Sequence, residues 1–284
     1  MNNINNSSLE QIQNIANQYK KFSNEINTYN QASQIIEFQM NLSKINEPFE
    51  KIQKLINNPI SDFNKKLNDF KERVEELYRQ TPKNLLTLSF YGWYLDFETT
   101  PAEPIELGNK INDGDIDFVN EYLHKYYTHN LDNILSHLIS YHPERKEIFN
   151  QIIEAHKQGY YYISIPAIFA QIDGICFDFT KKKFFMKNNK KKDEYLHLPE
   201  ITHELKNISN ITLKSFLSPI YSDTPIFTHT SNLDIYPIYL NRHEILHGVD
   251  KEYGTEINSL KCISLLKYLS DILIRLSDKT EAAE

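Results

Sequence analysis

Apolar side chains recur at alternating spacings of three and four in two stretches of the N-terminal third. The first set is Ile12, Ile15, Tyr19, Phe22, Ile26, Tyr29, Ile36 and Met40, with polar Ser33 in the same register. The second set is Phe63, Leu67, Phe70, Val74 and Leu77. This period predicts two amphipathic helices, the second ending near Thr81-Pro82. The heptad register of the first is typical both of a long helix packed on its own protein and of an intermolecular coiled coil.

Residues 85–98 are rich in aromatic side chains and contain Trp93, the only tryptophan of the chain. Core packing is the expected role, and a stacking platform for nucleic-acid bases is the alternative. The acidic, Pro- and Gly-containing residues 101–117 are typical of a connection that leads to another helix. We therefore predict an N-terminal helical, partly coiled-coil region at residues 1–100 and a C-terminal helical domain at residues 118–276.

The C-terminal region shows further helical periodicity. Apolar spacing predicts two short helices over residues 118–126 and 131–138, and a third that begins at Pro143. The pattern after residue 254 predicts a last helix that begins at Thr255, as its N-cap, and ends near Leu276. Together these elements favour a helical bundle.

Residues 160–175 form an almost wholly apolar segment, which predicts a central buried helix with Ser164 as its cap and Pro166 in its first turn. Asp173 lies within this segment. A buried carboxylate is costly unless it is paired, so we expect Asp173 to find a partner, with Arg242 as the candidate. Exposure to solvent, or capping of a neighbouring helix, is the alternative.

Composition supports a mostly α-helical globular protein. The chain has 284 residues, of which 40% are hydrophobic and only 7 are glycine. Cys176 and Cys262 lie far apart, so neither a disulfide framework nor a Cys-x-x-Cys metal knuckle is expected. No export signal and no run of 18 apolar residues is found, which predicts a cytoplasmic protein without a membrane span. The net charge of −7 argues against indiscriminate coating of nucleic acid.

A local basic segment interrupts this acidic balance at residues 181–192, where seven of twelve residues are lysine. We expect it to be an insertion in the C-terminal domain. Its candidate contacts with a nucleic-acid strand are Lys181, Lys182, Lys183, Lys190, Lys191 and Lys192, with Phe184 and Phe185 between them. An exposed hairpin or loop kept soluble by its charges explains the same composition.

The chemistry of the chain is concentrated in residues 241–248, which read Asn-Arg-His-Glu-Ile-Leu-His-Gly. His243, Glu244 and His247 spell H-E-x-x-H, which on a helix offers two imidazoles to zinc and a carboxylate to a metal-bound water. No third ligand follows at a recognisable spacing. Zinc peptidase activity, with zinc as cofactor, is therefore an alternative prediction.

Arg242 and His247 also suit metal-free cleavage of RNA, which needs a base for the 2′-OH, an acid for the departing 5′-oxygen and a cation for the phosphorane charge. The R-H-x-x-L-H-G pattern resembles the HEPN superfamily of α-helical domains, many of which are ribonucleases in toxin, abortive-infection and CRISPR systems. The resemblance covers roughly residues 144–276. It implies that Arg242 binds the scissile phosphate, that His247 is general acid or base, and that His243 assists.

The resemblance further implies a homodimer or higher homo-oligomer, because two copies of the motif usually meet across an interface in HEPN ribonucleases. In a continuous helix Arg242 and His247 would face about 140° apart, which a second copy would accommodate. Asn241 and Asp173 join the lysines as candidate substrate-binding residues. The prediction is thus a cofactor-free endoribonuclease acting as a toxin or antiviral defence effector, with RNA and an antitoxin or regulatory protein as partners. A non-catalytic helical interaction module is the alternative beside the zinc peptidase.

Overall fold

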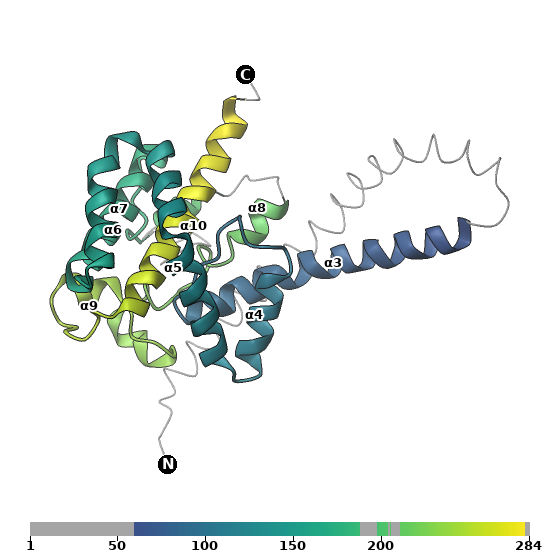
Figure 1. The fold of residues 1–284 in the computed structure, drawn as a ribbon, viewed down its shortest axis with the longest axis horizontal. Helices are drawn as coiled ribbons and strands as arrows, with labels where there is room; N and C mark the ends of the chain where they lie inside the picture. Colours follow the sequence, from purple (N-terminus) through teal and green to yellow (C-terminus); the bar gives the residue numbers. More distant parts are fainter. Residues whose placement is uncertain (1–59, 188–197, 204, 206–210, 282–284) are drawn as a thin grey trace, which may run out of the picture.

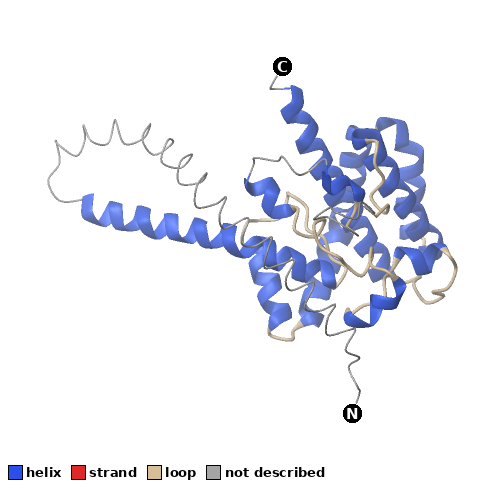
Figure 2. Cartoon of the chain, turned by 180° about the vertical axis from the view of Figure 1, so that it is seen from behind, coloured by secondary structure: helices blue, strands red, loops and turns tan. Residues whose placement is uncertain are grey.

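The computed structural model describes residues 60–187, 198–203, 205 and 211–281. The predicted first amphipathic helix, the coiled-coil alternative, and Lys190, Lys191 and Lys192 lie outside these residues. Helices dominate the described part, and its only β pairing is an isolated bridge between Lys187 and Pro199 (Figure 2). The mostly α fold predicted from the sequence is confirmed.

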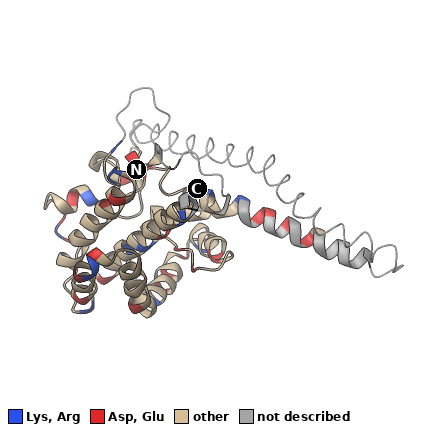
Figure 3. Cartoon of the chain, turned by 90° about the horizontal axis from the view of Figure 1, so that it is seen from above, with Lys and Arg blue, Asp and Glu red and all other residues tan. Residues whose placement is uncertain are grey.

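The bounds of the helices are α3 Ile60–Phe90, α4 Glu103–Asn112, α5 Ile116–Tyr141, α6 Lys146–Lys157, α7 Tyr161–Thr180, α8 Ile211–Phe216, α9 Arg242–Leu246 and α10 Glu256–Glu281. The helices follow one another along the chain, with short connections from α4 to α7 and longer ones from α7 to α8 and from α8 to α9. Three 3-10 turns accompany them, η2 Pro143–Arg145, η3 Glu200–His203 and η4 Thr230–Ile235. The first part of α3 projects from the bundle (Figure 1), and acidic residues lie along its described portion (Figure 3).

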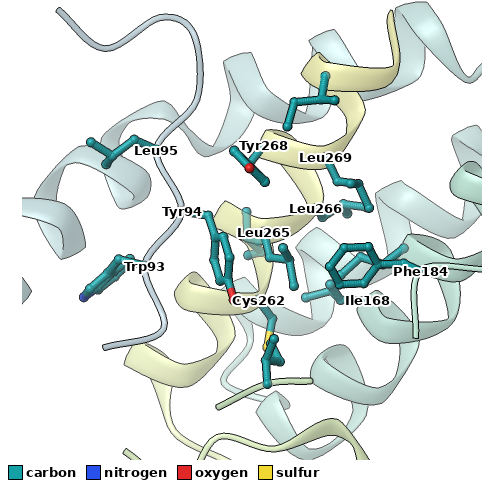
Figure 4. Packing of buried hydrophobic residues seen from close by; sticks show 14 of the residues in the cluster. Trp93, Tyr94, Leu95, Ile168, Phe184, Cys262, Leu265, Leu266, Tyr268 and Leu269 are labelled. Carbon is teal, nitrogen blue, oxygen red and sulfur yellow. The ribbon is translucent and has the colours of Figure 1, made fainter. Parts of the chain in front are cut away.

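Helix α10 is the centre of the bundle and packs against both α7 and α5. Residues 259–274 of this helix are all buried, so it is surrounded on every side. Its apolar residues meet those of the other elements, including Tyr94 and Ile168 (Figure 4). The predicted last helix is confirmed, with the Asn258 N–H donating to Thr255 Oγ1 at 3.2 Å as expected of an N-cap.

The elements before α6 differ from the predictions in three respects. Helix α3 does not end at Pro82 but continues to Phe90, because its last two turns carry Leu85 and Leu88 into the core, which offsets the cost of an internal proline. The expected connection before residue 118 contains α4. The two short helices predicted over 118–138 are one helix, α5, whose polar interruption at residues 128–130 lies away from the core.

The aromatic segment after α3 belongs to the core. Trp93 is fully buried, its ring stacks on Tyr127 with 5.7 Å between centroids, and its Nε1–H donates to Asn120 Oδ1 at 2.9 Å. Tyr94 packs on Tyr268 of α10. Core packing, the expected role, is confirmed, and the indole is not available as a stacking platform for bases. One hydrophobic cluster extends from this segment through α10.

Helix α7 begins one turn earlier than predicted, so Ser164 is not its cap and Pro166 lies inside it. A proline at this position cannot donate to the carbonyl of Tyr162, four residues before it. The hydroxyl of Tyr253 donates to that carbonyl instead, at 3.0 Å. In the described part of the chain, α7 is the one helix long and apolar enough to cross a membrane by length and composition, and here it packs between α6 and α10.

Candidate functional site

The motif segment is held in place by the side chain of Asn241. Its Oδ1 accepts the backbone N–H groups of His243 at 3.0 Å and Glu244 at 3.2 Å, which caps the start of α9. Its Nδ2 donates to the carbonyls of Pro225 at 2.7 Å and Thr228 at 3.1 Å. Asn241 is fully buried, and both ends of its amide are occupied within the protein. It therefore positions the motif and is not accessible to a substrate.

The motif lies on a single helical turn and not on a long helix. Helix α9 ends at Leu246, His247 is its C-cap, and Gly248 adopts a positive φ of 70°, which favours glycine. The N–H groups of Val249 and Asp250 donate to the Glu244 carbonyl at 2.9 and 3.2 Å and close the turn. The chain leaves the helix immediately after the second histidine as a result.

The two histidines of the motif lie side by side at the surface. The ring centroids of His243 and His247 are 4.3 Å apart, with the ring planes inclined by 54°. The helical spacing of four residues brings them together, and the His247 N–H still donates to the His243 carbonyl at 3.1 Å. Both side chains are accessible to solvent and therefore to a substrate.

Arg242 turns toward α7 and meets an acidic and an aromatic side chain. Its terminal NH2 lies 4.0 Å from Asp173 Oδ2, and its guanidinium carbon lies 5.4 Å from the centre of the Phe185 ring. The backbone N–H of Arg242 donates to the Ile226 carbonyl at 3.2 Å. Its buried Nε has no hydrogen-bond partner among the described residues. Asp173 and Phe185 thus hold one side of the guanidinium, and its Nε donates to no described residue.

Asp173 contacts the partner expected from the sequence. Its Oδ1 accepts the N–H of Phe185 at 2.9 Å, while its Oδ2 faces Arg242. Burial raises the pKa of Asp173, and the hydrogen bond from Phe185 and the charges of Arg242 and Lys183 oppose that rise. The carboxylate therefore links α7, the segment after it and the motif.

The surroundings of His243 favour the neutral form of its imidazole more than water does around a free histidine. Partial burial lowers the pKa of His243, and His247 lowers it further, while Glu244 acts in the opposite direction. Arg242 and His229 add to the lowering. A neutral imidazole can accept a proton, which is the property required of a general base.

The described lysines of the basic segment differ in their surroundings. The Lys181 ammonium lies 5.6 Å above the Phe177 ring, and Lys182 Nζ lies 3.2 Å from Glu200 Oε1, so both are engaged away from the motif. Lys183 is exposed and close enough to Asp173 to affect its pKa. Of these three lysines, Lys183 is the one that acts on a residue of the site, Asp173. Phe184 is buried in the core, and Phe185 packs on Phe169 and under Arg242.

A metal centre would need a third ligand beside His243 and His247. Within the described residues, no group of three or more His, Cys, Asp or Glu side chains has an arrangement that could hold a metal ion. The zinc alternative thus has two of its ligands adjacent in this structure.

One neighbour of the motif, His229, was not singled out from the sequence, and Phe185 was noted only as an aromatic residue of the basic segment. His229 belongs to the turn that Asn241 holds, and Phe185 supports Arg242. The sequence carries no signal for His229, because the side-chain amide of Asn241 and the backbone N–H of Arg242 bring its turn to the motif. The site combines an arginine, a pair of exposed imidazoles and a nearby lysine, which suits binding of a phosphate and transfer of protons. No protein-family model, curated protein or solved structure matches this chain.

Proposed function

We propose that the protein is a metal-independent endoribonuclease of the HEPN type. The single observation that carries the proposal is the pairing of the exposed imidazoles of His243 and His247 on a capped surface turn that begins with Arg242. Cleavage of RNA without a metal needs a cation for the phosphate and groups that accept and donate a proton. Arg242 provides the cation, and the two imidazoles provide the groups that accept and donate a proton.

In the proposed reaction, one imidazole takes the proton of the ribose 2′-OH as the 2′-oxygen bonds to phosphorus. The bond from phosphorus to the 5′-oxygen breaks, and an imidazolium gives its proton to that oxygen. The products are a 2′,3′-cyclic phosphate and a free 5′-hydroxyl. Arg242 stabilises the negative charge of the phosphorane. The lowered pKa of His243 supports its role as the base, which leaves His247 as the acid.

We further propose that two copies of the chain meet at this site. Apolar side chains beside the motif support this, because Leu246 is 41% and Val249 61% exposed, and Ile163 at the start of α7 is 66% exposed. A second copy would cover them and bring its own motif close. By its resemblance to HEPN effectors, we place the activity in the cytoplasm, in toxin or anti-phage defence, under the control of an antitoxin or regulatory protein.

The test is to incubate the purified chain with single-stranded RNA in excess EDTA and to identify the product ends. We expect cyclic phosphate ends, and a loss of about 10²- to 10⁴-fold in rate for Arg242→Ala and His247→Ala. His124→Ala, a change on α5, is the matched control and should cleave at the rate of the unmodified protein. Activity that requires added zinc and acts on peptides would identify the peptidase instead. Binding without any cleavage would identify an interaction module.

A further inference from the structure

The turn that precedes η4 lies against the motif through three hydrogen bonds. Asn241 Nδ2 donates to the carbonyls of Pro225 and Thr228, and the Arg242 N–H donates to the carbonyl of Ile226. Thr228 is therefore directly attached to the residue that caps α9. His229, the next residue, is carried to the edge of the site by this attachment.

The turn is also fixed from its other side. Thr228 Oγ1 donates to Asp223 Oδ2 at 2.6 Å, and the Tyr236 hydroxyl donates to the Asp223 carbonyl at 2.9 Å. Both Thr228 and Tyr236 are buried. The backbone that presents His229 is thus anchored before and after the histidine, so the position of the ring is defined by the fold.

One nitrogen of the His229 ring has a structural role. His229 caps η4, because Nδ1 accepts the N–H of Ser231 at 3.3 Å, and Nδ1 also lies 3.0 Å from Ser231 Oγ. A neutral imidazole that accepts at Nδ1 carries its proton on Nε2. No hydrogen bond to Nε2 is found among the described residues, and the side chain is exposed. Its N–H is free to donate to a ligand.

We infer that His229 is a third imidazole of the site, whose Nε2–H donates to a phosphate of the bound RNA strand next to the scissile one. The inference rests on the proposed function for the identity of the ligand. Its geometric basis is the attachment of the His229 turn to Asn241 and Arg242. The site then contacts two consecutive phosphates, with Arg242 on one and His229 on the other.

The charges around His229 suit this role. A protonated His229 would also act on His243, whose pKa is lowered mainly by its own partial burial and by His247. Arg242 is the permanent cation of the same surface, and Asp173, Glu244 and the Thr228-bound Asp223 are acidic groups near it. Asp173 is engaged by Phe185 and Arg242. An anionic strand is therefore the ligand favoured at His229.

The two ring nitrogens can be tested separately by substitution. The side-chain amide of asparagine matches the position of Nδ1, so His229→Asn keeps the cap on Ser231 and removes the Nε2 donor. The amide of glutamine matches the position of Nε2, so His229→Gln keeps a donor there. The matched control is His129→Asn, which changes another exposed histidine on α5, away from the motif. Thermal unfolding of each variant establishes that the fold is kept.

The experiment measures binding of a fluorescent 2′-O-methyl RNA dodecamer, which lacks the attacking hydroxyl and cannot be cleaved through it. We expect His229→Asn to weaken binding about tenfold, since a hydrogen bond to a charged group is lost, while His229→Gln and His129→Asn bind nearly as the unmodified chain. Wild-type binding by His229→Asn would overturn the inference, and so would equal weakening in both His229 variants.

Cleavage of an unmodified RNA of the same sequence is measured in parallel, so that failure of the inference and failure of the proposed function are distinguishable. If the unmodified chain cleaves RNA and His229→Asn binds and cleaves normally, the role of His229 is rejected and the ribonuclease proposal stands. Loss of binding in His229→Asn, with no cleavage by the unmodified chain, supports the phosphate contact and rejects the ribonuclease. Absence of both binding and cleavage in the unmodified chain rejects both.

Discussion

Asp173 of α7 and Arg242 of α9 face one another with 4.0 Å between Oδ2 and NH2. The same carboxylate accepts the N–H of Phe185, whose ring lies beside the guanidinium. Helix α7, the segment that follows it and the motif, which is distant in the sequence, thus converge on one side chain. The ion pair is long and partly exposed, so it contributes little to the free energy of unfolding, and its main effect is to orient Arg242.

Substitutions of Asp173 can separate the contribution of its charge to the free energy of unfolding from that of its hydrogen bond. Asp173→Asn keeps an acceptor for the Phe185 N–H and removes the charge, whereas Asp173→Ala removes both. We expect Asp173→Ala to lower the free energy of unfolding by about 1 to 2 kcal/mol, because a polar N–H loses its partner, and Asp173→Asn to lower it less. Urea denaturation measures both variants. Equal losses would show that the charge, and not the hydrogen bond, is what matters.

A second charged cluster lies away from the motif, between α10, α5 and the segment after Trp93. Lys267 is 1% exposed, and its Nζ lies 2.7 Å from Asp271 Oδ2 and 3.1 Å from Glu98 Oε1. Burial alone would favour the neutral forms, but mutual attraction raises the pKa of Lys267, and attraction with His137 and Lys267 lowers that of Asp271. The pair is therefore charged in the fold.

Removal of one partner of this buried pair should cost far more than removal of both. Lys267→Met leaves Asp271 buried without its cation, and we expect a loss of about 3 to 5 kcal/mol in the free energy of unfolding. The double variant Lys267→Met with Asp271→Leu should recover much of that loss. A double-mutant cycle by urea denaturation measures the difference. Additive losses would mean that the two groups do not interact.

Gly108 of α4 lies directly against Asn84 of α3. A Cβ at this position would stand 2.6 Å from the Asn84 Cβ, which cannot move without shifting the helix. We expect Gly108→Ala to lower the free energy of unfolding by about 1 to 3 kcal/mol through overpacking, despite the higher helix propensity of alanine. The matched control is Asn109→Ala on the exposed side of the same helix. A stabilised Gly108→Ala variant in thermal unfolding would contradict the close packing.

Two buried histidines predict a loss of stability in mild acid. Burial lowers the pKa of His142 and of His156, and each ring contacts a serine of α10 at 2.8 Å, Ser270 and Ser259 respectively. Because the folded-state pKa values lie below the ordinary 6.5, the unfolded chain takes up protons first as the pH falls. The stabilisation is thus complete above pH 6.5 and declines below it.

We expect the free energy of unfolding, measured in urea, to decrease progressively from pH 7 to pH 5. His156→Gln should be less stable at pH 7 and show a shallower decline, because one of the two groups no longer titrates. His129→Gln, at an exposed position, should leave the slope unchanged. A slope that is the same in His156→Gln and in the unmodified chain would assign the pH dependence to other groups.

Local patterns in the sequence were sufficient for some elements and not for others. The period of three and four in residues 255–276 predicted α10 with its cap, because a buried helix needs a matching apolar face. The same reasoning predicted that α3 ends at Pro82 and that α5 is two helices. A local pattern shows the cost of a proline or of a polar interruption, but it does not show the burial of apolar side chains that offsets this cost. Leu85 and Leu88 are buried against elements that the local pattern cannot reveal.

The sequence by itself determined the helical class of the protein and the spacing that sets His243 beside His247, because both follow from the period of an α-helix. It also indicated that Asp173 needed a cationic partner, because a buried carboxylate does. Only the tertiary structure decided that Asn241 is buried as a cap, that Lys181 and Lys182 are engaged elsewhere, and that the turn before His229 is bonded to the motif. These depend on hydrogen bonds and burial between segments distant in the chain, which no local pattern contains.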